Sequence, residues 1–370
     1  MNLRTYAEID LNAIKHNFDE VRRKVSPDSK ILAVVKADAY GHGAVEISKL
    51  LDDECDFFGV ACIEEAVELK ENGIKKPVLI LGRVFPWDYE TVCKYEIRIP
   101  IFRYEDAKAL SDESVKQGKN TPFHFCIDTG MSRIGFQITE KDADICKEIA
   151  ALPCIYPEGL FSHFATADCK DLSRALKQRE KYKQFCEMLS SRGIEIPLKH
   201  LNNSAGIINF DEYFNMCRMG IITYGLYPSD EVSKEIIKLK PALAWKTLIS
   251  HIKILEEGRE ISYGGTYKTE EPRKIATIPV GYADGYPRCL SNIGKVLICG
   301  KYAPITGRVC MDQFMVDVTG IDCNPGDEVV LVGKQGDAVL SMEEVSEAAY
   351  SLNYELPCRI SKRVPRVYIK

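Results

Sequence analysis

The sequence predicts a (β/α)8 barrel followed by a mostly β domain. Between residues 10 and about 230, strand-like apolar runs alternate eight times with stretches of helical spacing, which is typical of such a barrel. After about Pro241, Val, Ile and Thr alternate with polar residues and Gly breaks recur, which favours short β-strands. An open doubly wound sheet is the alternative, but Gly41-His42-Gly43 does not continue as the glycine-rich turn of that fold. We place the barrel at residues 11–235 and the β domain at residues 1–10 plus 236–370.

The strand-then-helix units follow one another directly. Asp10 is placed to cap a first helix, whose apolar face repeats at helical spacing through Val21. The eight predicted strands are Ile31–Val35, Phe57–Val60, Val78–Leu81, Ile97–Ile101, Phe123–Ile127, Glu158–Phe161, Pro197–His200 and Phe214–Arg218. The helices that follow them are predicted at Ala44–Leu51, Ile63–Glu71, Trp87–Lys94, Glu105–Gln117, Glu140–Ala150, Leu172–Arg192, Ala205–Phe210 and Ile221–Gly225.

In the second domain the predicted strands include Lys274–Val280, Lys295–Cys299, Phe314–Val318 and Glu328–Val332. Thr5–Ile9 also alternates, and we expect it to join this domain.

Composition narrows the function classes. The 370-residue chain has a net charge of −5, which gives no basic footprint for nucleic acid. It has no apolar stretch long enough to span a bilayer and no apolar signal core at its start, so we expect a cytoplasmic protein. The fourteen cysteines are scattered without a Cys-x-x-Cys pair. Those in apolar or helical runs, such as Cys146, Cys186 and Cys299, are expected to be small core residues in a reducing compartment, and no metal site is expected.

The first barrel strand ends in an unusual residue. Five apolar residues, Ile31–Val35, lead directly to Lys36. Burial lowers the pKa of a lysine and prepares the amine to form a Schiff base with an aldehyde cofactor. Gly41 and Gly43 leave the next turn open to close ligand approach. The alternative is a lysine that simply reaches solvent at a strand end.

Polar residues also follow the later strands, where barrel enzymes place their chemistry. These groups are Asp128–Arg133 after the fifth strand, Ser162-His163 at the sixth, His200 and Asn202–Ser204 at the seventh, and Arg218–Ile221 at the eighth. The last two loops often bind phosphate, and here Ser204 offers a hydroxyl while Gly220 and Ile221 offer backbone amides. Each group alone could be structural, but together they predict one site on one rim.

These motifs resemble those of bacterial alanine racemases, which are pyridoxal-phosphate enzymes with a barrel and a C-terminal β domain. The resemblance runs nearly end to end. It covers Ala7–Leu11, Val35–Gly43, Asp128–Gly135, Arg218–Gly220, Ile261–Gly264, Gly281–Gly285, Cys310–Asp312 and Asn353–Glu355. It implies a homodimer with shared active sites, pyridoxal 5'-phosphate as cofactor and alanine as substrate.

The resemblance also implies a role for each matching residue. Lys36 would carry the cofactor, and its phosphate would be held by Tyr40, Ser204, Gly220, Ile221 and Tyr354. Arg218 would meet the pyridine nitrogen, with His163 beside the ring. Arg133 and the Met311 backbone would bind the substrate carboxylate. The remaining positions, Tyr282 at the entrance, Asp312 lining the site, and His200, Asn203 and Cys310, would support it.

Lys36 and Tyr263 would be the two bases. Racemisation removes the α-proton from one face of the amino acid and returns it on the other, so bases on opposite faces suffice. A free tyrosine titrates near pH ~10, and Tyr263 therefore needs positive charge or donors nearby, for which Arg218 and His200 are candidates. An arginine opposite the ring nitrogen cannot accept its proton. That choice leaves the ring neutral and disfavours transamination and decarboxylation.

Alternatives remain at the level of function. One is a serine or broad-specificity racemase of the same fold. A decarboxylase of the same plan should carry a carboxylate where Arg218 stands, and a non-catalytic cofactor carrier would lack the β domain with Tyr263. Tyr354 puts a bulky ring where serine racemases carry a smaller polar residue, so we expect a preference for alanine.

One position departs from the family pattern. Many members carry a carbamylated lysine seven residues before the carboxylate-binding arginine, but counting back from Arg133 gives Cys126. We expect a bound anion, most simply chloride, beside Arg133. A Cys126 thiolate or ordered water are the alternatives. Gly130 and Gly135 are expected to allow close ligand approach to this loop.

Overall fold

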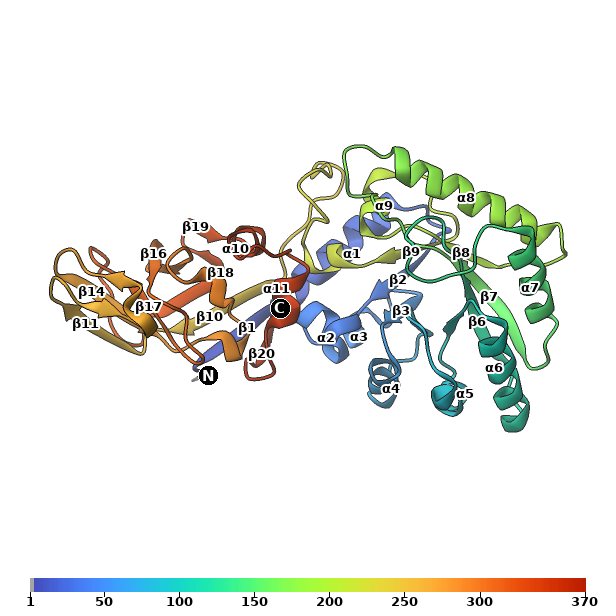
Figure 1. The fold of residues 1–370 in the computed structure, drawn as a ribbon, viewed down its shortest axis with the longest axis horizontal. Coiled ribbons are helices and arrows are strands. Elements are labelled where there is room, and N and C mark those ends of the chain that lie inside the picture. Colours follow the sequence, from blue (N-terminus) through green and yellow to red (C-terminus); the bar gives the residue numbers. More distant parts are fainter. Residues whose placement is uncertain (1–2) are drawn as a thin grey trace. The chain divides into compact units, whose positions relative to one another are not determined.

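The structure is a computed structural model that describes residues 3–370. By its internal contacts the chain divides into two compact units. The barrel unit consists of Ile14–Ala39 and Ala44–Lys240, and the β unit consists of residues 3–13, Tyr40–Gly43 and Pro241–Lys370 (Figure 1). The short segment Tyr40–Gly43, which interrupts the barrel sequence, therefore belongs by contacts to the β unit.

Eight parallel strands form the barrel unit. They are β2 Lys30–Val34, β3 Phe57–Val60, β4 Val78–Ile80, β5 Ile99–Ile101, β6 Thr121–Cys126, β7 Ile155–Phe161, β8 Leu198–His200 and β9 Met216–Met219. Each overlaps a predicted strand, and most of their residues are buried, as expected for strands covered on both faces. The alternation that predicted them therefore reflects real strand-then-helix units.

Hydrogen bonds join these strands in sequence order into a closed ring. Two four-stranded parallel sheets run β4-β3-β2-β9 and β5-β6-β7-β8. A parallel bridge between Leu79 and Arg98 connects the sheets at one seam. At the other seam the Arg218 amide donates to the Asn202 carbonyl over 2.9 Å. The closed ring confirms the (β/α)8 barrel, and it directs the ends of all eight strands to one rim.

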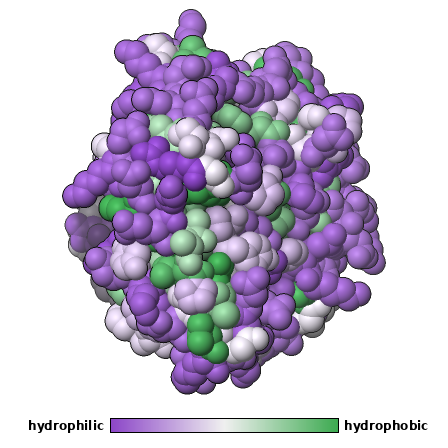
Figure 2. All heavy atoms as spheres, turned by 90° about the vertical axis from the view of Figure 1, so that its right-hand side faces the viewer, coloured by the Kyte–Doolittle hydropathy of each residue, from purple (hydrophilic) through white to green (hydrophobic). Residues whose placement is uncertain are grey.

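Helices cover the strands (Figure 1). They are α1 Leu11–Lys24, the short α2 Lys36–Gly41, α3 Ala44–Leu51, α4 Ile63–Glu71, α5 Tyr89–Tyr95, α6 Tyr104–Gln117, α7 Glu140–Ala150, α8 Ser173–Ser190 and α9 Ser204–Asn209. Two 3-10 turns lie at Pro86–Asp88 and Ile221–Tyr224. The Asp10 carboxylate accepts from the Ala13 amide over 3.0 Å, which confirms the predicted cap. Figure 2 shows a mostly hydrophilic face crossed by a narrow hydrophobic strip, consistent with helices that turn polar sides outward.

The β unit contains one large, mostly antiparallel sheet in the order β11-β14-β17-β16-β15-β18-β10-β1-β20. Its strands are β1 Thr5–Asp10, β10 Leu243–Leu248, β11 His251–Leu255, β14 Arg273–Ile278, β15 Lys295–Ile298, β16 Lys301–Thr306, β17 Phe314–Asp317, β18 Glu328–Gln335, β19 Ala338–Leu340 (paired with β18) and β20 Arg366–Ile369. A small hairpin pairs β12 Glu260–Ile261 with β13 Tyr267–Lys268, and α10 Met342–Ala348 and α11 Glu355–Arg359 complete the unit.

The first strand lies between β10 and the edge strand β20 of this sheet. β1 pairs antiparallel with β10 and parallel with β20, which confirms that Thr5–Ile9 joins the β domain. Beneath it an aromatic cluster forms part of the core, with the Tyr286 ring stacked 4.9 Å from Phe314 and 5.8 Å from Trp245. The start of the chain is thereby tied to elements more than 230 residues away.

The structure tests the expected burial of the cysteines. All fourteen cysteines are free, but Cys299 is exposed and Cys186 is half-buried, so assigning them to the core was wrong; only Cys146 of the three is buried. An apolar run at a strand end does not by itself bury its last residue. Within residues 3–370 no helix is long and apolar enough to cross a membrane.

Candidate active site

Lys36 directly follows the first barrel strand and begins a left-handed turn. The Val35 amide donates to the Gly59 carbonyl at 2.8 Å, so β-type pairing continues up to the lysine. The next four residues, Ala37–Tyr40, all have φ between 52° and 54°. A run of left-handed non-glycine residues is unfavourable by about 1–2 kcal/mol per residue. The sequence predicted no such turn, because alanine and tyrosine give no local signal for it.

Side chains of the barrel unit hold the start of this turn. The Glu65 carboxylate accepts from the Ala37 amide at 2.6 Å and from the Ala61 amide at 2.7 Å. Asp38 accepts from the Ala44 amide at 2.8 Å. These hydrogen bonds compensate the strain beside Lys36, and they show that Asp38 shapes the loop.

The two glycines at the end of the turn serve protein packing within the β unit. A Cβ on Gly41 would lie 2.0 Å from the Pro357 carbonyl oxygen, and one on Gly43 would lie 1.8 Å from the Tyr368 hydroxyl. The close approach predicted for a ligand is therefore made by the chain itself. Between them His42 is fully buried and donates from Nδ1 to the Tyr40 carbonyl at 2.9 Å.

Arg218 on β9 is buried among uncharged acceptors. Its guanidinium donates to the carbonyl oxygens of Ser162 at 2.6 Å, His200 at 2.8 Å and Leu201 at 2.9 Å. It also donates to the Nδ1 atoms of His200 at 3.0 Å and His163 at 3.3 Å. Burial lowers the pKa of Arg218 to about 10, and the guanidinium remains charged at neutral pH.

His163 connects several of the predicted site residues. Burial lowers the pKa of His163 well below its usual value, and the charges of Arg218, Arg133 and Lys36 lower it further. These cations must lie near the imidazole to act on it, so the barrel brings Lys36, His163, Arg133 and Arg218 into one electropositive region. A neutral imidazole there accepts a hydrogen bond from Arg218.

The predicted phosphate-binding residues of the barrel unit form a second group. The Ser204 hydroxyl accepts from the Gly220 amide at 3.0 Å, which brings the loops after β8 and β9 together. That hydroxyl keeps its own proton for another acceptor. Ile221 is buried at the start of the following 3-10 turn. Asn203 caps α9 by accepting from the Gly206 amide at 2.9 Å, so its role here is structural.

Cys126 is a neutral thiol. Burial raises its pKa to about 12, and its Sγ donates to the Ile134 carbonyl at 3.9 Å. The thiolate alternative is therefore wrong, because burial outweighs the nearby cations. Arg133 itself is exposed in the single chain, so its charge is solvated.

The glycines of the Arg133 loop also serve the backbone. A Cβ on Gly135, whose φ is +123°, would lie 2.5 Å from backbone atoms of Ile127 and Asp128. Gly130 has φ +135°, and the atom nearest to a Cβ there is the Gln178 Cγ at 3.6 Å, which is an ordinary contact. Protein atoms make the close approach at Gly135, and close ligand approach to this loop at Gly130 stays a prediction.

In the β unit Tyr263 lies on a loop packed against residues 307–310. Its side chain is 71% exposed. The preceding Ser262 donates to the Arg308 carbonyl at 2.7 Å and lies 3.4 Å from the Cys310 Sγ. A Cβ on Gly307 would lie 2.7 Å from Ile261 and Ser262 atoms, so these two segments approach closely.

The turn that carries Tyr282 packs on the same segment. The Tyr282 amide donates to the Cys310 carbonyl and the Ala283 amide donates to the Met311 carbonyl, both at 3.0 Å. The structure thus brings Tyr263, Tyr282, Cys310 and Met311 together within the β unit. The Tyr282 and Met311 side chains are also exposed.

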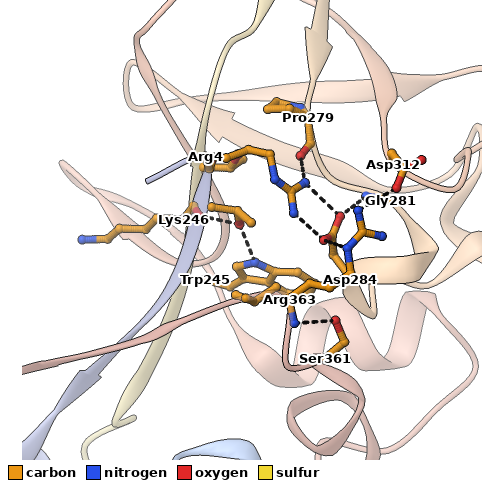
Figure 3. Close-up of polar contacts among 12 residues, drawn as sticks. Arg4, Trp245, Lys246, Pro279, Gly281, Asp284, Asp312, Ser361 and Arg363 are labelled. Atoms are coloured by element: carbon orange, nitrogen blue, oxygen red, sulfur yellow. Dashed lines mark hydrogen bonds and ion pairs between the residues drawn. The ribbon is translucent and has the colours of Figure 1, made fainter. Parts of the chain in front are cut away.

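A buried carboxylate supports this turn (Figure 3). Asp284 is fully buried and accepts from both guanidinium nitrogens of Arg4, at 2.6 and 3.1 Å, and from the Gly281 amide at 3.0 Å. Arg363 lies 3.6 Å from Asp284 and pairs with Asp312 at 2.8 Å. Asp312 is thereby tied to the turn of Tyr282 through a shared arginine.

Tyr40 and Tyr354 also meet within the β unit. Their ring centroids are 6.3 Å apart with the planes tilted by 55°. Burial raises the pKa of the Tyr40 phenol, so it stays protonated and keeps a donor. The Tyr354 carbonyl accepts from the Cys358 thiol at 3.2 Å, which orders the segment after Tyr354.

Several supporting residues were missed from sequence. Each of them makes a hydrogen bond to a site residue, to a residue next to one, or to a residue in contact with one; they are Glu65, Asp284, His124 and Glu158. Glu158 offered a signal, because a carboxylate inside a barrel strand needs a partner. Asp284 stands in the quoted Gly-Tyr-Ala-Asp-Gly motif, but its partner Arg4 is 280 residues away and no local pattern links them.

Comparisons with known proteins agree with this geometry. Residues 9–228 match the family model of the alanine racemase N-terminal domain and residues 242–368 that of the C-terminal domain. The chain is 48% identical to an alanine racemase of Clostridium perfringens (strain SM101 / Type A), over 99% of this chain and 95% of that protein.

Solved structures show the same likeness. An alanine racemase structure from Clostridium difficile 630 superposes with a TM-score of 0.97 at 42% identity, covering 100% of this chain and 96% of that one. An alanine racemase structure from Bartonella henselae, which has covalently bound pyridoxal phosphate, gives a TM-score of 0.88 at 30% identity over 100% of both chains. From its sequence, its fold and these matches, the chain belongs to the alanine racemase family of pyridoxal-phosphate-dependent enzymes.

Proposed function

We propose that this chain racemises alanine with bound pyridoxal 5'-phosphate, using Lys36 and Tyr263 as the two bases. The observation that carries the proposal is the electropositive region around His163. There the charges of Lys36, Arg133 and the buried Arg218 all act on the His163 imidazole. An amine, a guanidinium donor and a carboxylate-binding arginine are the groups that this chemistry requires.

The residues present fit the cofactor. The Lys36 amine would attach its aldehyde, and the Ser204 hydroxyl with the Gly220 and Ile221 loop would hold its phosphate together with Tyr40 and Tyr354. Arg218 would donate to the ring nitrogen, since a guanidinium can only donate. A decarboxylase of the same plan should carry a carboxylate at that position, and this chain carries Arg218 there, which favours racemisation over that alternative.

When bound, pyridoxal phosphate withdraws electrons from the α-carbon and makes its proton acidic. The protein then has to remove a proton from one face and supply another on the opposite face. The Lys36 Nζ removes or returns the proton on the D-enantiomer's face, and the Tyr263 hydroxyl does so on the L-enantiomer's face. Arg133 and the Met311 backbone hold the substrate carboxylate, which fixes the α-hydrogen between the bases.

We propose a homodimer in which Tyr263, Met311 and Asp312 of the partner subunit complete each site. The exposure of Tyr263 and Met311 supports this, because a base that works in a dry site is not expected to be 71% exposed. Tyr282 would narrow the entrance.

Mixing inactive variants tests this sharing. Verified heterodimers of a Lys36→Ala chain with a Tyr263→Phe chain should regain activity, because one of the two sites then holds both bases. A heterodimer of the double variant Lys36→Ala/Tyr263→Phe with a Tyr263→Phe chain is the matched control and should stay inactive. No recovery in the first mixture would refute shared sites.

Substrate preference is the second part of the proposal. We expect alanine to be preferred over serine, because Tyr354 fills space that a serine hydroxyl would need. A pocket difference of this size is worth about 1–3 kcal/mol, so serine should be racemised slowly. Assays with L-alanine, L-serine and L-lysine test this, and a higher kcat/KM for serine would favour the serine or broad-specificity alternative.

We place this activity in the cytoplasm. The fourteen free cysteines fit a reducing compartment. Cell fractionation followed by racemase assay tests the placement.

A further inference from the structure

Arg218 is a buried cation whose described side-chain partners are histidines. Only 3% of it is exposed, and its other acceptors are the three backbone carbonyls given above. None of the ion pairs found within residues 3–370 includes it. A buried cation without a carboxylate partner is costly. The residues that hydrogen-bond to the histidine partners of Arg218 therefore decide how its charge is balanced.

A continuous hydrogen-bonded chain leads from Arg218 across four strands. His200 on β8 contacts Arg218 through Nδ1 at 3.0 Å, and its Nε2 lies 2.8 Å from the Nδ1 of His124 on β6. The Nε2 of His124 lies 3.3 Å from the Glu158 carboxylate on β7. Arg98 donates to both oxygens of Glu158, at 3.0 and 3.2 Å. His124 and His200 are fully buried.

The direction of every hydrogen bond in this chain follows from Arg218. A guanidinium only donates, so His200 Nδ1 accepts and its proton is on Nε2. His200 Nε2–H then donates to His124 Nδ1, which places the His124 proton on Nε2. That N–H donates to the Glu158 carboxylate. Both imidazoles are therefore neutral Nε2–H tautomers, aligned from the cation towards the anion.

The charges at the two ends agree with this direction. Burial lowers the pKa of His200 well below its usual value and lowers that of His124, which keeps both imidazoles neutral. Burial would raise the pKa of Glu158, but its hydrogen bonds with His124 and Arg98 outweigh burial and lower it to about 2. Aligned hydrogen bonds in a low-dielectric interior polarise one another. The carboxylate can therefore act on Arg218 without touching it.

We infer that Glu158, acting through His124 and His200, is the counter-charge of Arg218. These three side chains are positioning residues. They hold the guanidinium in one orientation, and under the function proposed above that orientation presents a donor to the ring nitrogen of the cofactor. The alternative is that Glu158 forms only a structural ion pair with Arg98, as Asp106 does with Arg83 elsewhere in the barrel.

The first test measures the histidine tautomers of the unsubstituted enzyme and uses variants only to assign the signals. Long-range 15N–1H spectra of the holoenzyme resolve histidine tautomers, and the chain has only six histidines. Signals lost in His124→Gln and His200→Gln give the assignment. Both residues should be neutral with the proton on Nε2, and an Nδ1–H tautomer or a charged imidazole at either position would overturn the inference.

The second test removes the charge and keeps an acceptor. In Glu158→Gln the amide oxygen still accepts from His124, so the N–H proton signals of His124 and His200 should move upfield. The kcat should fall roughly tenfold, as for other groups that orient a site residue, with KM within about twofold. Asp106→Asn is the matched control, because it breaks a similar bidentate arginine pair that reaches no histidine.

The outcomes separate this inference from the proposed function. Unchanged histidine signals in Glu158→Gln, or equal losses of kcat in the two variants, would reduce Glu158 to a structural ion pair. The tautomers are measured independently of turnover, so a protein that lacked racemase activity could still show the hydrogen-bonded chain. If Glu158→Gln does not fold, the tautomers of the unsubstituted enzyme still decide.

Discussion

The barrel unit and the β unit hold their buried charges in opposite ways. In the barrel a buried cation, Arg218, reaches its carboxylate only through two neutral histidines. In the β unit a buried anion, Asp284, accepts hydrogen bonds directly from Arg4 and from a backbone amide. The first arrangement leaves the cation without a direct carboxylate partner among the described residues, and the second fixes a turn. The barrel therefore suits cofactor binding, and the β unit suits placing side chains on exposed loops.

The largest effect is expected from Lys36, the base that we propose in the barrel unit. Lys36→Ala should lower racemisation by more than about 10⁴-fold, because it removes both the cofactor attachment and a base. The visible absorbance of the purified protein should disappear as well. A variant that still shows a reducible link between cofactor and protein would show that another lysine carries the cofactor.

The β unit's base should give a narrower defect. Tyr263→Phe should lower racemisation by roughly 10²- to 10⁴-fold, but exchange of the α-proton with solvent should survive for one enantiomer, because Lys36 still serves its face. Incubation of each enantiomer in deuterated buffer measures this. Equal loss of exchange for both enantiomers would contradict the two-base division between the units.

The buried anion should matter for stability. Asp284→Asn weakens hydrogen bonds from Arg4 and Gly281 and should destabilise the protein by about 2–3 kcal/mol, since hydrogen bonds to charged groups are the stronger ones. Urea unfolding of the β unit measures the change. Asp312→Asn, whose partner Arg363 is half exposed, is the control and should change stability by less than about 1 kcal/mol. Similar losses in both variants would argue against a special role for burial.

Three buried histidines of the barrel unit should make the free energy of unfolding fall in mild acid. The pKa values of His124, His163 and His200 are lowered from 6.5 in the folded state, so the unfolded chain binds protons more readily. Their contribution is present above pH 6.5 and is lost as pH falls, by about 1.4 kcal/mol per pH unit for each proton. Below pH 4.5 Glu158, with a folded pKa of about 2, adds to the loss. Urea midpoints that are constant from pH 7.5 to 5.5 would contradict this.

The smallest effect concerns Arg133. With a neutral thiol at Cys126, an anion such as chloride remains our proposal for the group that balances this arginine. Because Arg133 is exposed, the pair should be worth less than about 1 kcal/mol. Replacing chloride by a bulky anion should raise the KM for alanine roughly twofold. An unchanged KM, with only water beside Arg133 in a high-resolution map, would remove the anion from the proposal.

The sequence predicted the helices and strands of the barrel better than the side-chain contacts that hold the site residues in place. Helices such as Ile63–Glu71 and Glu140–Ala150 were placed to the residue, because amphipathic spacing and glycine stops are local signals. The positions of Lys36 and Arg218 at strand ends followed from the barrel itself. The pairing of Arg4 with Asp284 and the histidine chain could not be predicted, since Arg4 and Asp284 are 280 positions apart and His124 and His200 are 76 apart. Such contacts depend on the finished fold.

The left-handed turn after Lys36 has a consequence for the order of folding. Its four non-glycine residues together cost on the order of 4–8 kcal/mol, so the segment gains nothing from forming early as an isolated helix. It can persist only after Glu65 is in place to accept from the Ala37 amide. We therefore expect the lysine's final backbone geometry to be among the last features acquired as the chain folds. Capture of the cofactor then reports a completed barrel, and a newly made chain that has not closed its barrel should remain colourless.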